Sequence, residues 1–236
     1  MLKYSNNLLT FIFSFIISQM LIGQAQGHIS FVMTDAFSDN PQVNAQMEMM
    51  KGSTTDVFYI GDESLTINNM MGGMINIKMR VEKDAGMKMA YDMMGSKFYI
   101  PMSKTEMDKM KAEGDNPMSE LQISYDESDT KQIAGFTCYK MVAIPIANPD
   151  MKIEAYITED IKTKAALIQG VEMEQFRGFP LEIVANMGTL VMTTTAISFE
   201  ASCDPSDLIL DINGYTEMTF DEFVASMGQM GGGFGF

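Results

Sequence analysis

The chain alternates apolar and polar residues with a period of two, as strands do when they bury one face of a sheet. Segments rich in β-branched, aromatic and methionine residues are separated by Gly, Asp, Asn and Ser, which favour turns. Because the spacing of the segments is that of an antiparallel meander, we expect a mainly β (α+β) protein with few helices. The predicted strands are residues 28–36, 45–51, 56–60, 65–69, 75–81, 87–91, 97–102, 121–125, 136–145, 152–158, 181–186 and 190–199.

Three segments have a helical pattern instead. Ser103-x-x-Glu106 and Thr219-x-x-Glu222 have the form of a capping box, in which two side chains bond each other's backbone N–H groups at the start of a helix. They predict short helices that end near residue 112 and near Gly228. A third helix is expected at residues 161–173.

Residues 101–117 separate two sets of strands and contain the first predicted helix. This segment is either a crossover or lid within one fold, or a domain boundary. We favour a single domain at residues 26–228 with one continuous sheet, because each half alone would expose too much apolar face. The glycine-rich tail at residues 229–236 is expected to be flexible.

Residues 1–25 have the features of a signal peptide. Lys3 is their only charge, an apolar run follows at residues 8–22, and Gly23-Gln24-Ala25 places small residues where a signal peptidase reads them. The alternative is a retained membrane anchor, but the run is shorter than the ~20 residues that span a bilayer. No cysteine for lipid attachment lies near the cleavage point. We therefore expect a periplasmic or secreted protein with no stable membrane span after cleavage.

The excess of acidic over basic residues limits the classes of partner that the protein can bind. The formal net charge is −15 at pH 7, from 31 Asp and Glu against 16 Lys and Arg, and it is spread along the chain. A protein that binds nucleic acid needs a basic stripe to neutralise phosphates, and the sequence has none. We expect no nucleic-acid partner, and we expect the acidity to favour solubility.

Methionine dominates the composition. The chain has 26 methionines and no tryptophan, and fifteen of the methionines lie between Met47 and Met118. Residues two apart in a strand share a face, so several predicted strands present rows that could line a concavity. Methionine has three rotatable bonds, so such a lining adapts to varied apolar ligands; the alternative is an ordinary filled core. The candidate lining residues are Met47, Met49, Ile75, Ile77, Met79, Met87 and Met89.

Binding of a soft metal ion is another possible role of clustered methionines. Thioethers select Cu(I), and Met70, Met71 and Met74 would supply three sulfurs. His28 is the only histidine, which leaves no ligand set for Cu(II) or zinc. Copper is an alternative to the ligand lining, and we otherwise expect no metal and no cofactor.

The sequence contains no catalytic motif. It has no G-x-S-x-G, P-loop, H-E-x-x-H or C-x-x-C pattern. A carboxylate-only glycosidase would lack a tryptophan to stack a sugar ring. Cys138 and Cys203 form a candidate disulfide if their Cα atoms lie close enough, and are otherwise free thiols. We expect that the protein is not an enzyme.

Four motifs follow one another along the second half of the chain. In chain order, they are Ile133-Ala134-Gly135-Phe136-Thr137-Cys138-Tyr139-Lys140, Glu154-Ala155-Tyr156-Ile157-Thr158-Glu159-Asp160-Ile161, Gly178-Phe179-Pro180-Leu181-Glu182 and Leu208-Ile209-Leu210-Asp211-Ile212-Asn213-Gly214-Tyr215. Together they resemble a family of secreted bacterial proteins, the domain-of-unknown-function 4412 family. The resemblance implies a fold similar to that of the lipoprotein carriers (LolA/LolB-like): a curved antiparallel sheet forming an incomplete barrel over helices, with an apolar cavity between them. It carries over no functional residues.

Two functions are compatible with these observations. The first is an exported protein that holds a lipid or acylated peptide in the concavity of the sheet, with residues 101–117 as a gate. The second is a structural or protein–protein interaction module of the cell envelope whose methionines fill its core. The expected partner is a hydrophobic small molecule or lipid in the first case, and an envelope protein in the second.

Overall fold

The computed structural model describes residues 25–113, 118, 120–163, 165, 167 and 173–229. The described strands are β1 (Gln26–Ser38), β2 (Thr54–Ile60), β3 (Glu63–Met70), β4 (Ile75–Glu82), β5 (Gly86–Met93), β6 (Ser96–Ser103), β7 (Leu121–Ile133), β8 (Phe136–Pro145), β9 (Met151–Thr158), β10 (Phe179–Met187), β11 (Leu190–Glu200) and β12 (Thr216–Glu217). The described helices are α2 (Pro41–Met50), α3 (Lys104–Glu113), α4 (Phe220–Gln229) and the 3-10 turns η2 (Met71–Gly73), η3 (Met173–Gln175) and η4 (Pro205–Leu208).

These strands form one 12-stranded sheet in the order β12-β6-β5-β4-β3-β2-β1-β11-β10-β9-β8-β7. The strand β1 therefore lies in the interior of the sheet, between two meanders. The chain runs outward through β2 to β6, crosses to the far edge, and returns inward through β7 to β11. Neighbouring strands are antiparallel except β12, which pairs in parallel with β6. The predicted continuous sheet is confirmed, and the segment between β6 and β7 is a crossover.

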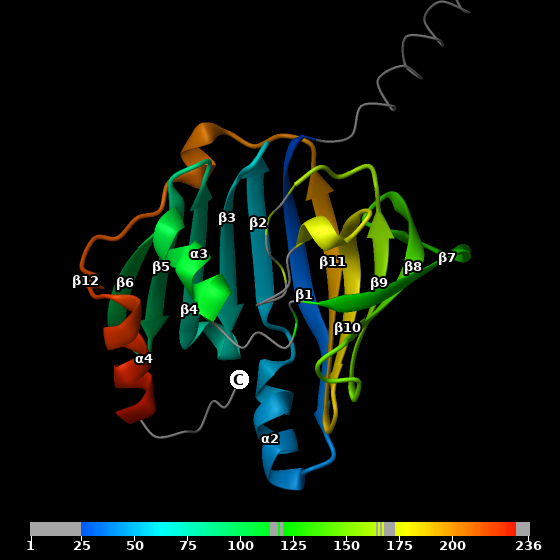
Figure 1. Ribbon diagram of the computed structural model, residues 1–236, viewed down its shortest axis with the longest axis horizontal. Helices are drawn as coiled ribbons and strands as arrows, with labels where there is room; N and C mark the ends of the chain where they lie inside the picture. Colours follow the sequence, from blue (N-terminus) through cyan, green and yellow to red (C-terminus); the bar gives the residue numbers. More distant parts are fainter. Residues whose placement is uncertain are drawn as a thin grey trace, which may run out of the picture.

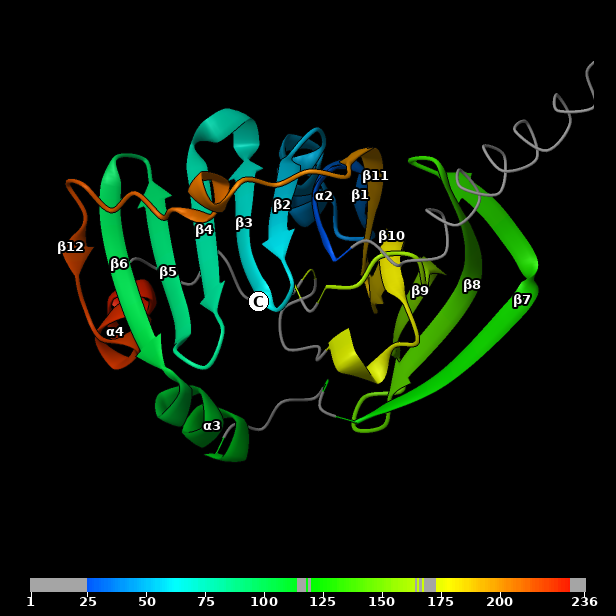
Figure 2. The ribbon, with the colours of Figure 1, turned by 90° about the horizontal axis from the view of Figure 1, so that it is seen from above.

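The sheet is strongly curved and its edges do not meet. Figure 2 shows it from above as an open arc, with η3 on the inner side and α4 beside the β12–β6 edge. The mainly β class, the curved antiparallel sheet and the incomplete barrel are confirmed. The largest core lies on the inner side of β1, β2 and β7 to β11, where Phe31, Tyr59, Met141 and Leu181 are almost completely buried. Each such side chain contributes about 1.5–3 kcal/mol on burial.

One predicted strand is wrong. Residues 45–51 do not form a strand, because residues 41–50 form the helix α2, at the lower end of Figure 1. Asn40 caps this helix by accepting a hydrogen bond from the backbone N–H of Gln42 at 3.0 Å. Pro41 occupies the first helical turn, where a missing N–H costs nothing. The residues that follow are mainly Ala, Gln, Glu and Met, which favour helix, so the apparent alternation around Met47 was misleading.

Two of the three predicted helices are confirmed with their capping boxes. The Ser103 N–H donates to the Glu106 carboxylate at 2.8 Å, and the Glu106 N–H donates to Ser103 Oγ at 3.3 Å. Thr219 and Glu222 make the same reciprocal pair at the start of α4. The predicted helix at residues 161–173 lies largely outside the described residues; Ile161 itself forms an isolated bridge.

Some sequence predictions fall outside the described part of the chain. The signal peptide, except its last residue, and almost all of the glycine-rich tail are among them, and so are residues 114–117 of the crossover. Among the helices that the structure describes, none is long and apolar enough to cross a membrane.

Candidate functional site

Methionines from three strands meet on the inner face of the sheet. Met79 on β4 lies opposite Met89 on β5, and Met89 lies opposite Ile100 on β6. Met87 lies opposite Met102 one pair further along. These residues belong to a second hydrophobic cluster, separate from the large core. We call it the concave methionine cluster; its members are Met79, Met87, Met89, Tyr91, Ile100, Met102, Met107, Met218, Phe220 and Phe223.

Two helices cover this cluster. The helix α3 contributes Met107, and α4 contributes Phe220 and Phe223. The Phe223 ring is 7% exposed, and its centroid lies 4.5 Å from that of Tyr91, whose pKa is raised by burial. Among the α4 residues whose side chains are described, Phe223 alone is buried. Among the described side chains of α4, Phe223 is therefore the main apolar contact with the sheet, worth about 1.5–3 kcal/mol.

The inner face of β4 continues the apolar lining away from the cluster. Ile75 is 7% exposed and lies opposite Met93, while Ile77 is half-buried opposite Tyr91. Five of the seven predicted lining residues therefore share one inner face: Ile75, Ile77, Met79, Met87 and Met89. Side chains two apart share a face only in a strand, so the helix α2 does not align the other two. Met47 is half-buried on α2, and Met49 is 50% exposed.

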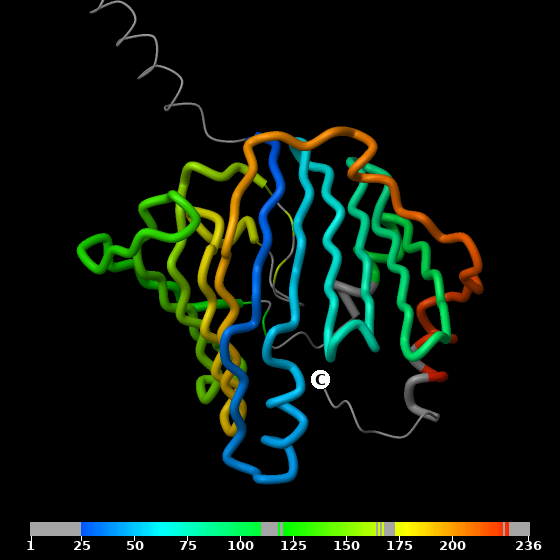
Figure 3. The backbone as a smooth tube through the Cα atoms, turned by 180° about the vertical axis from the view of Figure 1, so that it is seen from behind, coloured from blue at the N-terminus to red at the C-terminus, as the bar shows by residue number. Residues whose placement is uncertain are grey.

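The lower end of the sheet in Figures 1 and 3 carries an apolar rim. The cross-strand pairs Ser38–Leu190, Met70–Ile75, Met93–Ser96 and Met187–Met151 show that these strand ends lie at the same end of the sheet. Of the nine exposed large hydrophobic side chains among the described residues, six lie at this end. We call them the apolar rim: Phe37, Met49, Met74, Met94, Ile146 and Met187.

Turn sequences differ between the two ends of the sheet. At the rim, the β5–β6 turn is Met94-Gly95, and Met94 has φ 52°. Both residues of this two-residue turn have positive φ, a geometry in which Asn-Gly is favoured. At the other end, the β2–β3 turn holds Asp62 and the β4–β5 turn holds Lys83 and Asp84, all exposed. The rim was missed in the sequence, although methionine before glycine in a tight turn is the signal that indicates it.

The candidate copper ligands lie at this rim. Met70 ends β3, Met71 lies in η2 with φ 53°, and Met74 is 42% exposed. The backbone N–H of Met94 donates to the carbonyl of Met74 at 2.9 Å, which brings a second methionine turn beside them. Among the described residues, no group of three His, Cys, Asp or Glu could hold a metal ion. The Cu(I) site stays a prediction.

The only histidine lies beside a serine and an aspartate but does not form a catalytic triad. His28 Nε2 is 2.9 Å from Asp56 Oδ1 and 3.2 Å from Ser30 Oγ. The Ser30 hydroxyl donates directly to Asp56 Oδ1 at 2.6 Å, and the His28 ring stacks on Phe58. In a triad the two ring nitrogens serve different partners, whereas here one nitrogen faces both groups. The geometry does not activate Ser30.

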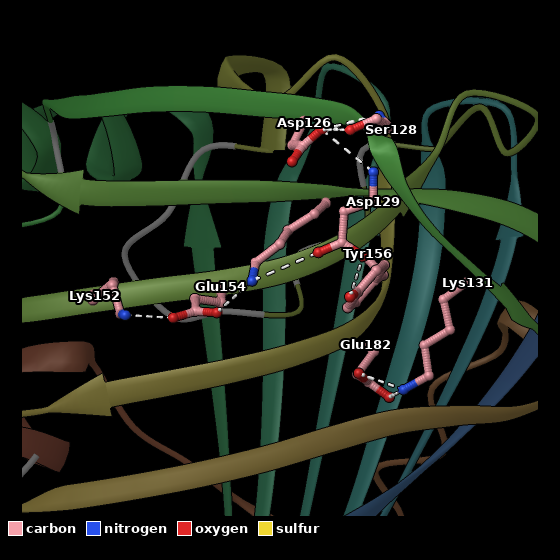
Figure 4. A network of polar contacts seen from close by, with 9 residues as sticks. Asp126, Ser128, Asp129, Lys131, Lys152, Glu154, Tyr156 and Glu182 are labelled. Atoms are coloured by element: carbon pink, nitrogen blue, oxygen red, sulfur yellow. Dashed lines mark hydrogen bonds and ion pairs between the residues drawn. The ribbon is translucent and has the colours of Figure 1, made fainter.

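The outer face of β7 to β10 carries a network of polar side chains, drawn in Figure 4. Lys131 pairs with Glu182 at 2.6 Å, and the Tyr156 hydroxyl donates to Asp129 at 2.9 Å. Tyr156 and Glu182 alternate with buried neighbours along β9 and β10, so both lie on the face opposite to those buried side chains. Exposed ion pairs of this kind contribute about 0–1 kcal/mol each. Ion pairs and hydrogen bonds therefore dominate this part of the outer face.

The candidate disulfide is not formed. Cys138 and Cys203 are free thiols, and both are buried. Cys138 packs in the large core, whereas Cys203 packs on the outer face against Leu65 and Leu208. Burial raises the pKa of Cys138 to about 12 and also raises that of Cys203, so neither thiol is activated as a nucleophile.

Comparison with known proteins finds distant similarities of fold. No family model matches the chain, and no curated protein matches it. The lipoprotein LppX of Mycobacterium tuberculosis is 11% identical over 85% of this chain and 99% of its own, with a TM-score of 0.37. A DUF1329 family protein from Desulfovibrio piger is 8% identical over 88% and 98%, also with a TM-score of 0.37.

A chain of the Pseudomonas aeruginosa MucA/MucB complex is 10% identical over 79% of this chain and 56% of its own, with a TM-score of 0.36. At these scores the similarities transfer no function. The resemblance to the domain-of-unknown-function 4412 family stays a prediction.

Proposed function

We propose that this protein binds an apolar ligand, a lipid or an acylated peptide, against the concave methionine cluster. The observation that supports it best is a continuous apolar face on β4 and β5. It begins at the rim with Met74, follows Ile75 and Ile77, and reaches Met79 and Met89. Such a face offers an acyl chain contacts from the exposed end of the sheet to the covered cluster.

The ligand would enter by displacing α4. Lifting this helix exposes Phe223, and the cost for that side chain is about 1.5–3 kcal/mol. An acyl chain that buries four methylene groups gains about 3 kcal/mol, which offsets that cost. Methionine side chains can then repack around chains of different length. In this account α4 is a gate together with α3, which forms part of the segment proposed from the sequence.

The ligand class and the expected export belong to the same proposal. An exported protein in the cell envelope is surrounded by lipids and acylated proteins, which supply the apolar chain. The protein needs no cofactor for such binding, and we propose no catalytic step.

The second function, an interaction module of the cell envelope, is favoured by a different observation. The inner side of β1, β2 and β7 to β11 is filled by twenty buried residues of the large core. A filled concavity stabilises the fold without binding a ligand. The two functions therefore differ in one requirement. Ligand binding requires that α4 can move away from the concave methionine cluster, and an interaction module does not.

Uptake of a dansyl-labelled fatty acid tests the proposal. We expect fluorescence to rise on mixing with the protein, and the double substitution Met79→Gln and Met89→Gln to weaken binding about tenfold. Glutamine has a similar length to methionine but loses contact with an acyl chain because its amide must be desolvated. Ile197→Gln is the control, since Ile197 is 61% exposed and lies outside the cluster. Equal binding by both variants, or no fluorescence change, would contradict the proposal.

A further inference from the structure

The outer face of the sheet holds a cavity that the sequence did not indicate. Its volume is about 610 Å³, within the range of small-molecule sites, roughly 300–1,000 Å³. Its floor comes from β2 to β6, and its roof is the segment after β11, at residues 203–215, which we call the strap. It lies on the opposite face from the concave methionine cluster, because its strand residues alternate with those of the cluster. Its lining includes Arg80, Glu82, Lys88 and Tyr99 from the sheet, and Ile209 and Ile212 from the strap.

The strap is fixed on both sides of the cavity. At its start, Asp204 and Asp207 form a capping box around η4, and Leu208 packs against Leu65. At its end, β12 pairs with β6, and Lys97 lies 5.4 Å from the centre of the Tyr215 ring. Figures 1 and 2 show the strap crossing from β11 to the edge of the sheet formed by β6 and β12. The strap thus forms a roof over the cavity that is held at both ends.

The middle of the strap leaves apolar side chains in water. Ile209 is 70% exposed and Ile212 is 40% exposed, and both line the cavity. They are two of the three exposed large hydrophobic residues, among those described, that lie outside the apolar rim. A ligand with an apolar group beneath the strap would remove part of this surface from water.

The floor carries two positive and two negative charges. Arg80 and Lys88 lie opposite each other on β4 and β5. Arg80 is 9% exposed, pairs with Glu63, and also donates to two backbone carbonyls, so it is fully engaged. Lys88 Nζ lies 2.8 Å from Glu82, and both side chains are about one-third exposed. Lys88 and Glu82 are therefore the pair whose mutual contact a charged ligand can replace.

A balanced floor favours a ligand that carries both charges. A lone anion beside Lys88 would also lie near Glu82, and a lone cation beside Glu82 would lie near Lys88, so each would meet repulsion as well as attraction. A zwitterion can place its ammonium group near Glu82 and its acidic group near Lys88. Tyr99 adds a hydroxyl donor, which stays protonated because burial raises its pKa.

We propose that this cavity binds a small zwitterion with an apolar side group, of the size and type of an apolar dipeptide. The site is independent of the proposed function, since the two lie on opposite faces of the sheet. Its ligand approaches from the outer face and does not require α4 to move.

Calorimetric titration with the dipeptide Leu-Leu tests the inference on the full mature chain. N-acetyl-Leu-Leu, which is an anion, and Leu-Leu amide, which is a cation, are the matched probes. We expect the zwitterion to bind at least about tenfold more tightly than either analogue. Equal affinities for the three probes, or no binding of Leu-Leu up to about 10 mM, would overturn the inference.

Variants locate the binding. Lys88→Met is expected to weaken Leu-Leu binding about tenfold, and the double change Ile209→Ser with Ile212→Ser should weaken it without altering the floor. Lys78→Met is the control, because Lys78 lies on the same face of β4 but does not line the cavity. Thermal unfolding of each variant checks the fold. Unchanged binding in both the Lys88 and the strap variants would place the ligand elsewhere and contradict the inference.

Discussion

Methionine side chains occupy two different environments in this protein. Met79, Met87 and Met89 pack inside the concave cluster, whereas Met74 and Met94 are exposed at the apolar rim. An exposed methionine in a tight turn gains nothing from burial, and at positive φ it carries a backbone cost of about 1–2 kcal/mol. Residues with strained backbone conformations cluster at functional and ligand-binding sites.

Replacing Met94 separates stability from binding. We expect Met94→Asn to raise the free energy of unfolding by about 0.5–1 kcal/mol, because asparagine tolerates positive φ and Asn-Gly suits this turn. The same change should slow fatty-acid uptake, because it removes an apolar contact at the rim. Urea unfolding and stopped-flow fluorescence measure the two effects. A loss of stability, or unchanged uptake, would count against a binding role for the rim.

Two glycines with positive φ should respond differently to alanine. At Gly86, which has φ 116°, an added Cβ would lie 2.2 Å from the Met102 carbonyl oxygen, so the strand end must move. At Gly61, which has φ 58°, a Cβ would meet no atom within 4 Å. We expect Gly86→Ala to cost more than about 2 kcal/mol and Gly61→Ala only about 1 kcal/mol. Chemical denaturation of both variants gives the comparison, and equal losses would contradict the close approach at Gly86.

Copper binding can be tested on its own residues. If Met70, Met71 and Met74 hold Cu(I), changing all three to leucine should abolish competition against a Cu(I) chelator, because leucine has no sulfur. The fatty-acid affinity should fall much less, since leucine keeps the apolar character. Competition that persists in the triple variant would exclude these three residues as the site.

The strands were predictable because one face of each is buried. The period-two pattern located eleven of the twelve described strands, and the strand β8 was placed at its observed bounds. The helix α2 was not predicted because its methionines also fit a strand pattern, although Asn40 and Pro41 form a helix start signal. The strand β12 has only two residues, and its pairing with β6 depends on where the strap crosses the sheet. No local pattern specifies such a contact.

The helix α4 is expected to loosen at low pH. Hydrogen bonds from the Thr219 backbone and hydroxyl hold the pKa of Glu222 below its ordinary value of 4.5. The stabilisation from this carboxylate is therefore fully present above pH 4.5 and is lost as the pH falls through the lowered pKa. The hydrogen-exchange protection factors of α4, which correct for the intrinsic pH dependence of amide exchange, should fall over that range.

Matched variants isolate this cap. Glu222→Gln should remove most of the pH dependence of the protection factors in α4, whereas Glu106→Gln, which changes the equivalent cap of α3, should leave it. Thr219→Ala should weaken the helix by about 1 kcal/mol at neutral pH. Protection factors in α4 that are independent of pH in the unmodified protein would contradict the role of Glu222.

At the scale of the whole molecule, the two ends and the two faces of the sheet are chemically different. One end has methionine turns and the other has charged turns, such as Asp62 and Lys83. The inner face is apolar, while the outer face holds polar networks and the cavity under the strap. With a formal net charge of −15, the protein is expected to avoid anionic surfaces, so its apolar rim is better suited to approach an uncharged or zwitterionic lipid surface.

The candidate site was only partly predictable. The face shared by Ile75, Ile77 and Met79 followed from strand period alone. The position of α4 over the concave methionine cluster could not be predicted, because the contact of Phe223 with Tyr91 joins residues that lie more than a hundred positions apart. The rim and the cavity under the strap likewise depend on which strand ends and segments the topology brings together.

Photo-crosslinking with a diazirine-labelled fatty acid tests the central claim most directly. After irradiation and proteolysis, mass spectrometry locates the residues that carry the label. We predict labels in β4, β5 and α4, around Met79, Met89 and Phe223, and we predict that excess unlabelled fatty acid removes them. Labels confined to other segments, or no label that competes with unlabelled fatty acid, would contradict binding at the concave methionine cluster.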